Sequence, residues 1–171
     1  ASLNENPKAL PGARNSSFLL IVVSVLIGLV LLFNALIFEQ ILNLSNQQRT
    51  IIWYALFGSI AAGLIEEVVF RGYLVINNRG KLYLVLSCIF FSLIFSLLHG
   101  YLWTYEEGLK WNLNKKSIFD SYILFLNSLV FYFLRFGLWN NNKSILPPIA
   151  AHISFNIGVF AIKHFQGFLV Y

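Results

Sequence analysis

Residues 17–38 form a long apolar run, and this run limits the chain to one class of fold. The run reads SFLLIVVSVLIGLVLLFNALIF and contains no charged residue. A transmembrane helix needs about 20 predominantly apolar residues to cross the hydrocarbon core. Of all 171 residues, 58% are hydrophobic and only 11% are charged, which is too few to cover a water-facing surface. We therefore predict an all-α, polytopic membrane protein.

Four further apolar segments follow the first, separated by short polar connections. We predict spans at 17–38, 51–76, 82–100, 118–139 and 147–163, and hence a bundle of about five transmembrane helices. Residues 17–171 would form a single transmembrane domain, preceded by a flexible polar tail at 1–16. The first span is too long for the apolar region of a cleavable signal peptide, about 7–15 residues, so we expect it to be retained. Lys and Arg residues divide five against five between the two sides, so charge predicts no orientation.

Several ionisable or strongly polar residues nevertheless lie inside these spans. A charged side chain at the bilayer centre costs at least about 2.5–3.5 kcal/mol, and such residues usually mark a functional site. Asp120 and Arg135 lie near the ends of a span, where we expect them to reach water. The remaining set comes from three different spans and comprises Glu66, Glu67, Arg71, His99, His152 and Asn156.

Helical spacing predicts that the two neighbouring glutamates, Glu66 and Glu67, face different partners. Residues four apart lie on one face of a helix, so Glu67 can form an ion pair with Arg71. Glu66 is rotated by about 100° from Glu67, because a helix has 3.6 residues per turn. We therefore expect Glu66 to face other partners, and the histidines and Asn156 have the right chemistry.

A carboxylate, two imidazoles and an amide are sufficient for hydrolysis of a peptide bond. Glu66 would lose hydration among apolar helices, which favours its acceptance of a proton from water. His99 could orient the same water molecule. His152 and Asn156 could donate hydrogen bonds to the oxyanion of a tetrahedral intermediate. The sequence shows no nucleophile-elbow motif, so an acyl-enzyme route is not supported.

A metal site is the alternative reading of the same side chains. Two histidines and one glutamate form the ligand set of many catalytic zinc sites, and here they would be Glu66, His99 and His152. The chain has no His-Glu-x-x-His helix, and the three ligands would come from separate spans. We therefore predict no cofactor and keep zinc as the less favoured alternative.

Three short motifs resemble those of a known membrane family. EEVVFRG at 66–72 looks like a Glu-Glu-x-x-x-Arg motif, FSLLH at 95–99 a Phe-x-x-x-His motif, and HISFN at 152–156 a His-x-x-x-Asn motif. In this order they resemble the CAAX-protease and bacteriocin-processing (CPBP, or Abi) family. The family-like core would cover about 51–163.

The resemblance implies an intramembrane glutamic endopeptidase, a type formerly described as a metalloprotease. By the family pattern, Glu66 and His99 activate the water, and His152 and Asn156 form the oxyanion hole. Glu67 and Arg71 match motif positions with supporting roles. The chain departs from the family in having only one span before the motif core.

The depths of the motif residues pose a geometric difficulty. Counted at about 1.5 Å per residue from the turn at 77–81, Glu66 lies about 17 Å into the membrane and His99 about 27 Å. The two can meet only if the third span tilts or if the chain around 72–79 lies partly along the interface.

We interpret the sequence as an endopeptidase that cleaves a membrane-associated peptide or protein. The alternative is a non-catalytic subunit or bacteriocin-immunity factor that binds a membrane protein partner; the aromatic loop 101–117 motivates it. An ion or proton carrier is less favoured, because the chain lacks the broken-helix symmetry of transporters. Lys and Arg are dispersed, so we expect contacts with membrane lipids and none with nucleic acid. We expect a multi-pass protein of a prokaryotic plasma membrane.

Overall fold

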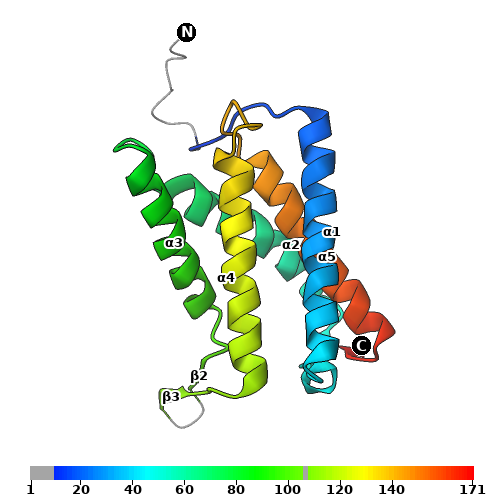
Figure 1. The fold of residues 1–171 in the computed structure, drawn as a ribbon. Helices are drawn as coiled ribbons and strands as arrows, with labels where there is room; N and C mark the ends of the chain where they lie inside the picture. The colour runs from blue at the N-terminus through cyan, green and yellow to red at the C-terminus, as the bar shows by residue number, and fades with distance from the viewer. Residues whose placement is uncertain (1–9, 106–107) are drawn as a thin grey trace.

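The computed structural model describes residues 10–105 and 108–171, which form a bundle of helices (Figure 1). Four helices in this part of the chain are long and apolar enough to cross a membrane: α1 (Phe18–Ile41), α3 (Lys81–Leu98), α4 (Lys115–Phe136) and α5 (Leu146–Phe165). A fifth and shorter helix, α2 (Ala55–Glu66), continues into a π-helix, η2 (Glu67–Tyr73). The prediction of an all-α, polytopic membrane bundle is confirmed.

Small elements tie the connecting loops together at one end of the bundle. A 3-10 turn, η1 (Ser45–Gln47), follows α1. Strand β1 (Ile51–Ile52) pairs in parallel with β4 (Leu169–Val170), and β2 (Trp103–Thr104) pairs in antiparallel fashion with β3 (Lys110–Trp111). The first pair fastens the segment after α5 beside the start of α2. The second pair forms a hairpin between α3 and α4.

The predicted second span, 51–76, is not one continuous membrane helix. Its first residues form β1, its middle forms the 12-residue α2, and its last part forms the π-helix η2. The helical chain therefore consists of 12 α-helical residues followed by 7 π-helical residues, and it is shorter at both ends than the predicted span. Five helices are therefore present, but only four in the described ranges qualify as spans by length and composition.

The predicted mismatch in depth between Glu66 and His99 is absent from the structure. Residues 74–80 are neither helix nor strand, so the helical chain that carries Glu66 ends before the turn at 77–81 from which the depths were counted. Oε2 of Glu66 lies 3.8 Å from Nε2 of His99, so the two side chains meet.

Capping residues explain where three of the long helices begin. The Ser17 hydroxyl accepts a hydrogen bond from a backbone N–H in the first turn of α1, at 3.2 Å. The side-chain Oδ1 of Asn114 does the same for α4, accepting from the Ser117 N–H at 2.8 Å. Both are favoured N-cap residues. In α5, Pro147 and Pro148 occupy the first turn, where no backbone N–H is needed.

Small residues bring the backbones of α1, α2 and α5 close together. A Cβ added to Gly28 of α1 would come within 2.3 Å of the Ala151 carbonyl oxygen in α5. A Cβ added to Gly158 of α5 would come within 2.3 Å of the Leu32 side chain. Gly63 places α2 against α5 in the same way. Membrane helices associate through such close packing, because lipid provides no hydrophobic force between them.

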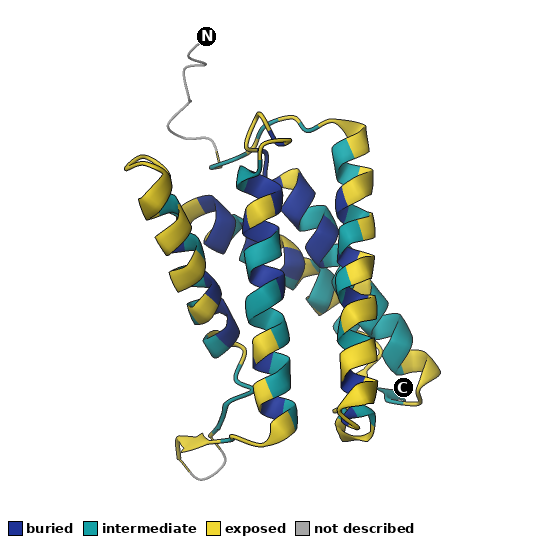
Figure 2. Cartoon of the chain, viewed as in Figure 1, coloured by how far each residue is buried: buried dark blue, intermediate teal, exposed yellow. Residues whose placement is uncertain are grey.

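Figure 2 shows that exposed residues cover the outer faces of α1 and α3, whereas the buried residues face the other helices. Among these outer residues are Leu26, Val30, Phe33, Val85, Ile89 and Phe90, all of them large and apolar. The core contains Phe131, Leu134 and Ala151, with Ile27 and Leu31 packed against it. An apolar outer surface around a packed interior is the arrangement expected of a protein in lipid.

The predicted N-terminal tail lies partly outside the described residues, because 1–9 are not among them. Residues from 12 onward contact the loop between α4 and α5. The Gly12 carbonyl accepts a hydrogen bond from the Ile145 N–H at 2.9 Å, and the Arg14 carbonyl accepts one from the Ser144 hydroxyl at 2.6 Å. This part of the segment is therefore fastened to the bundle.

The packing at Gly28 generates a test of the α1–α5 interface. Gly28→Ala should destabilise the protein by about 2 kcal/mol, because the new methyl group meets backbone atoms of α5. Gly58→Ala in α2 is the matched control, since a Cβ there would have nothing within 4 Å. Thermal unfolding in detergent micelles measures both. Equal unfolding temperatures for the two variants would contradict the packing.

Candidate active site

The predicted ion pair between Glu67 and Arg71 is present and is completely buried. An oxygen of Glu67, Oε1, lies 3.2 Å from Nη1 of Arg71, and both side chains are 0% exposed. The pair lies within η2, whose residues run from Glu67 to Tyr73. A buried charge needs a partner of opposite sign, so each residue makes the burial of the other tolerable.

Glu67 has a second partner that spacing along one helix does not reveal. The Nδ1 of His152 lies 2.8 Å from the same Oε1 atom, so the imidazole N–H donates to the carboxylate. This bond joins η2 to α5. It also fixes the orientation of the imidazole ring, which stacks on Phe131 with ring centroids 4.9 Å apart.

Arg71 is held on its other side by Ser128, which in turn is bonded to Ser92. Its Nη2 donates to the Ser128 hydroxyl at 2.7 Å and to the Ser128 carbonyl at 3.0 Å. The Ser128 hydroxyl donates to the Ser92 hydroxyl at 2.9 Å. Aromatic rings surround the guanidinium, with the centroid of Phe95 and that of Tyr132 each 4.8 Å from its central carbon. We did not single out Ser92 and Ser128 from the sequence, although small polar residues inside apolar spans are a known signal of helix contacts.

Tyr132 also stabilises the end of the π-helix. Its hydroxyl donates to the Phe70 carbonyl at 2.9 Å and lies 3.2 Å from the Leu74 carbonyl. A helix end leaves carbonyl groups without intrahelical partners, and in lipid no water can take their place. The Tyr132 side chain of α4 therefore holds η2 in the position that buries the ion pair of Glu67 and Arg71.

Glu66 faces away from the ion pair and towards two histidines, as the helical spacing predicts. Its Oε2 lies 3.8 Å from Nε2 of His99 and 3.7 Å from Nε2 of His152. The Oε2 atom is buried and has no hydrogen-bond partner among the described residues, whereas the whole side chain is 26% exposed. The structure therefore brings together three of the four residues proposed for catalysis.

The other nitrogen of each imidazole is occupied, and this orients both rings. The Nδ1 of His99 lies 2.7 Å from the Phe95 carbonyl and can only donate to it. The Nδ1 of His152 donates to Glu67. In the neutral rings the Nε2 lone pairs therefore both point towards Glu66. All three groups at this point are hydrogen-bond acceptors when the glutamate is ionised.

Asn156 lies one turn after His152 on α5 and lines the same cavity. Its Nδ2 donates to the Ser59 carbonyl of α2 at 2.9 Å. An amide nitrogen carries two N–H groups, so the second one can still donate into the cavity. Among the described residues, the hydrogen bond of the Asn156 side chain goes to Ser59 and not to Glu66 or the histidines.

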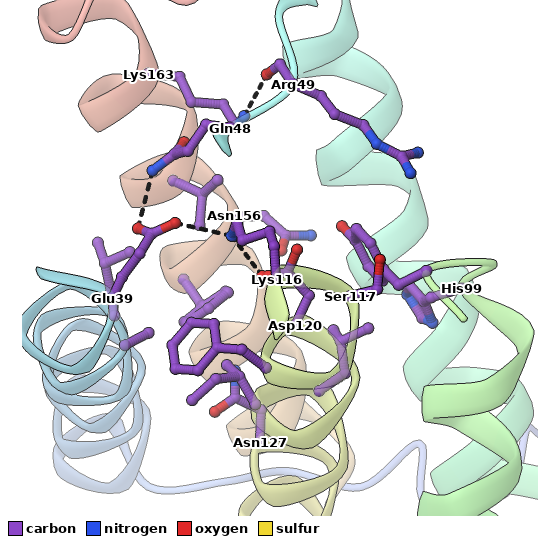
Figure 3. A pocket seen from close by; sticks show the side chains of 18 of the residues that line it. Glu39, Gln48, Arg49, His99, Lys116, Ser117, Asp120, Asn127, Asn156 and Lys163 are labelled. Atoms are coloured by element: carbon purple, nitrogen blue, oxygen red, sulfur yellow. Dashed lines mark hydrogen bonds and ion pairs between the residues drawn. The ribbon is translucent and has the colours of Figure 1, made fainter. Parts of the chain in front are cut away.

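The site lies at the inner end of a cavity of about 700 Å³ between the helices. Figure 3 shows polar side chains at its outer end, where α1 ends and α4 begins. There Lys116 forms an ion pair with Glu39 at 2.8 Å and another with Asp120, and Gln48 donates to Glu39 at 2.9 Å. We did not predict Glu39 and Lys116 as site residues. Asp120 was expected to reach water, and it lies at this polar mouth.

Tyr101 lies on the wall of the mouth, beneath Arg49, whose guanidinium carbon is 5.8 Å from the ring centroid. Burial, with a smaller effect from Asp120, raises the pKa of the Tyr101 phenol above its ordinary value. The hydroxyl therefore stays protonated and remains a hydrogen-bond donor at the mouth.

The residues of the zinc alternative, Glu66, His99 and His152, do converge. In 10–105 and 108–171, however, no group of three or more His, Cys, Asp or Glu side chains is arranged to hold a metal ion. The residue types themselves suit zinc. Chelation of the purified protein therefore tests whether it depends on a metal ion.

A comparison with protein families adds an independent observation. The family model described as Type II CAAX prenyl endopeptidase Rce1-like matches residues 48–158. The chain belongs to this Rce1-like family. The match includes all three motifs, at 66–72, 95–99 and 152–156, so the resemblance read from the sequence is confirmed. The Rce1-like family is a family of proteases, and with four candidate spans it supports a multi-pass membrane protease at this general level. No curated protein and no solved structure matches the chain.

The contacts of the two glutamates predict different effects of their substitution on stability. Glu67→Gln should lower stability by about 3 kcal/mol, because it leaves the buried Arg71 charge without a counter-charge. Glu66→Gln should leave stability unchanged, because the Glu66 side chain is partly exposed and Oε2 has no hydrogen-bond partner among the described residues. Thermal unfolding of the two variants in the same detergent gives the comparison. A larger loss of stability for Glu66→Gln than for Glu67→Gln would contradict the burial of Glu67 beside Arg71.

Proposed function

We propose that the chain is an intramembrane endopeptidase in which Glu66 activates the water that hydrolyses a peptide bond. The supporting observation is the position of Glu66 Oε2, at 3.7 and 3.8 Å from two imidazole nitrogens. These distances are too long for direct hydrogen bonds and short enough for one water molecule to bridge. A water molecule has two O–H donors, so it can serve Glu66 and one of the two imidazoles at the same time.

In the proposed reaction the bridging water donates one proton towards Glu66 and the other towards His99. As the water oxygen attacks the peptide carbonyl carbon, its O–H bond breaks and the proton moves to Glu66 Oε2. The electrons of the carbonyl double bond move to the carbonyl oxygen. When the tetrahedral intermediate collapses, the C–N bond breaks and the proton on Glu66 passes to the leaving nitrogen. Glu66 returns to its starting state.

Two groups on α5 are suited to stabilise the oxyanion. Asn156 has a second N–H that can point into the cavity, because only one is used by Ser59. His152 can donate through Nε2 when its ring carries both protons, and its Nδ1 is already bound to the Glu67 carboxylate at 2.8 Å. Arg71 supplies the counter-charge of Glu67. Glu67 and Arg71 are therefore positioning residues that act through His152.

The shape of the cavity is consistent with a membrane-associated substrate. Its inner walls include the apolar side chains Leu32, Leu36, Ile123, Leu124, Phe155 and Val159, and its mouth is polar. An apolar segment of a substrate can lie between the helices while the peptide bond reaches Glu66. The name of the family gives a prenylated CAAX sequence as the first substrate class to test.

We also propose that the reaction needs no metal ion. The side chains already provide a general base, an imidazole that orients water, and donors for the oxyanion. Each requirement of hydrolysis is thus assigned to a residue of the chain.

The base is tested by Glu66→Gln in proteoliposomes with prenylated CAAX peptides and other membrane-anchored peptides. The rate should fall about 1000-fold, because the amide cannot accept the proton of the water. Asn156→Ala should slow the reaction about 100-fold by removing an oxyanion donor. Cleavage by Glu66→Gln at the wild-type rate would refute the mechanism.

The metal is tested separately with purified wild-type protein. Treatment with EDTA and 1,10-phenanthroline should leave the rate unchanged, and elemental analysis should find less than one zinc per chain. Loss of activity on chelation, with recovery on addition of Zn²⁺, would overturn the metal-free proposal. It would also identify Glu66, His99 and His152 as the ligands to test next.

A further inference from the structure

The two ends of the bundle differ in charge. One end, at the top in Figure 1, contains the segments before α1, between η2 and α3, and between α4 and α5. Its described basic residues are Arg14, Arg79, Lys81, Arg135 and Lys143. The described carboxylates, Glu39, Glu66, Glu67 and Asp120, all lie elsewhere. In the part of the chain that the structure describes, this end is cationic only.

A pocket of about 250 Å³ opens among these segments. Its lining consists of Gly12, Arg14, Asn77, Asn78, Arg135 and Lys143. Guanidinium and ammonium groups donate hydrogen bonds, and the two asparagine amides can donate as well. This set of donors suits an anionic ligand.

Arg135 supplies a buried donor that lacks a protein partner. Its residue exposure is 3%, and its Nε donates to the Lys143 carbonyl at 3.3 Å. Its Nη1 is buried and has no hydrogen-bond partner among the described residues. The guanidinium lies against Gly12, where an added Cβ would come within 2.7 Å of Nη2. A buried charged donor without an acceptor is costly, so this nitrogen indicates a ligand.

The loop that carries Lys143 is held in place by its own hydrogen bonds. Asn140 donates to the Ser144 carbonyl at 2.8 Å and accepts from the Ser144 N–H at 3.0 Å. The next residue, Ile145, donates to the Gly12 carbonyl at 2.9 Å. The backbone that carries Lys143 is therefore positioned before any ligand arrives, which reduces the entropy lost on binding.

We propose that this pocket binds a phosphate group. A guanidinium matches the geometry of phosphate oxygens with parallel N–H groups, and Lys143 adds a point charge. The pocket lies where α4 ends at Phe136 and α5 begins at Leu146, and both helices are candidate spans. This depth is that of lipid headgroups, so an anionic phospholipid is the expected source of the phosphate. Free inorganic phosphate has the same chemistry and is the second source.

The test uses the full chain, purified in a neutral detergent and freed of lipid. Wild-type protein and the variants Lys143→Asn, Arg135→Gln and Arg79→Gln are titrated with phosphatidylglycerol, with a galactolipid that lacks phosphate, and with inorganic phosphate at matched ionic strength. Native mass spectrometry measures bound lipid, and thermal unfolding measures stabilisation. Lys143 has a φ of 51°, a conformation that asparagine tolerates, so this variant should fold even if Arg135→Gln does not.

Phosphatidylglycerol should bind wild-type protein in preference to the galactolipid, and Lys143→Asn should weaken this binding about tenfold. Arg79→Gln is the matched control, since it removes a charge at the same end but outside the pocket lining, and its affinity should not change. An increase in Tm with inorganic phosphate that is lost in Lys143→Asn would identify free phosphate as the source. Equal binding of the two lipids without such an increase, or an equal loss in Arg79→Gln, would overturn the proposal.

Discussion

The buried ion pair of Glu67 and Arg71 is the interaction on which the candidate site depends. A single charge left among apolar helices would cost several kcal/mol, so neither residue can be buried without the other. Each member of the pair also binds a different helix. Glu67 accepts from His152 of α5, and Arg71 donates to Ser128 of α4. The requirement to neutralise two charges therefore determines how three helical segments are placed around one point.

This constraint explains why two neighbouring glutamates differ so much. Glu67 is 0% exposed and its Oε1 contacts both Arg71 and His152, whereas Glu66 is 26% exposed and faces the cavity. A rotation of about 100° between adjacent residues of a helix is enough to separate the two environments. In the proposed mechanism only Glu66 changes its protonation state. Glu67 has a different part, because its hydrogen bond with Nδ1 orients His152.

Much of the fold could be predicted from the sequence, because lipid requires long apolar helices and the lengths of the apolar runs are evident in the sequence. The predicted first and last spans, 17–38 and 147–163, fall within or close to α1 and α5. The change from α-helix to π-helix at Glu67 was not predictable, because the residues on both sides of the change are mostly apolar and do not indicate where it occurs. The hydrogen bond from Tyr132 that stabilises the π-helix comes from a different helix.

In the candidate site too, contacts within one helix could be predicted from the sequence, and contacts between helices could not. The pairing of Glu67 with Arg71 follows from spacing along one helix, and the sequence predicted it. The bond between His152 and Glu67 depends on how α5 is rotated against η2. An apolar helix surrounded by lipid carries little periodic signal for that rotation, because both its buried and its exposed faces are apolar. The small residues Gly28 and Gly63 mark the packed faces, but the sequence alone does not say which helices meet there.

The polar mouth completes the physical argument for a hydrolytic site inside lipid. Water is a reactant in the proposed reaction, so it must reach Glu66 through surroundings that exclude it elsewhere. The ion pairs of Lys116 with Glu39 and Asp120 lie at the outer end of the cavity that contains Glu66. They give water polar partners at the entrance, and the apolar walls limit it further in. The ion pair at Glu67 is closed off from this route, since neither of its side chains is exposed. Of the two neighbouring glutamates, only Glu66 is therefore open to the cavity.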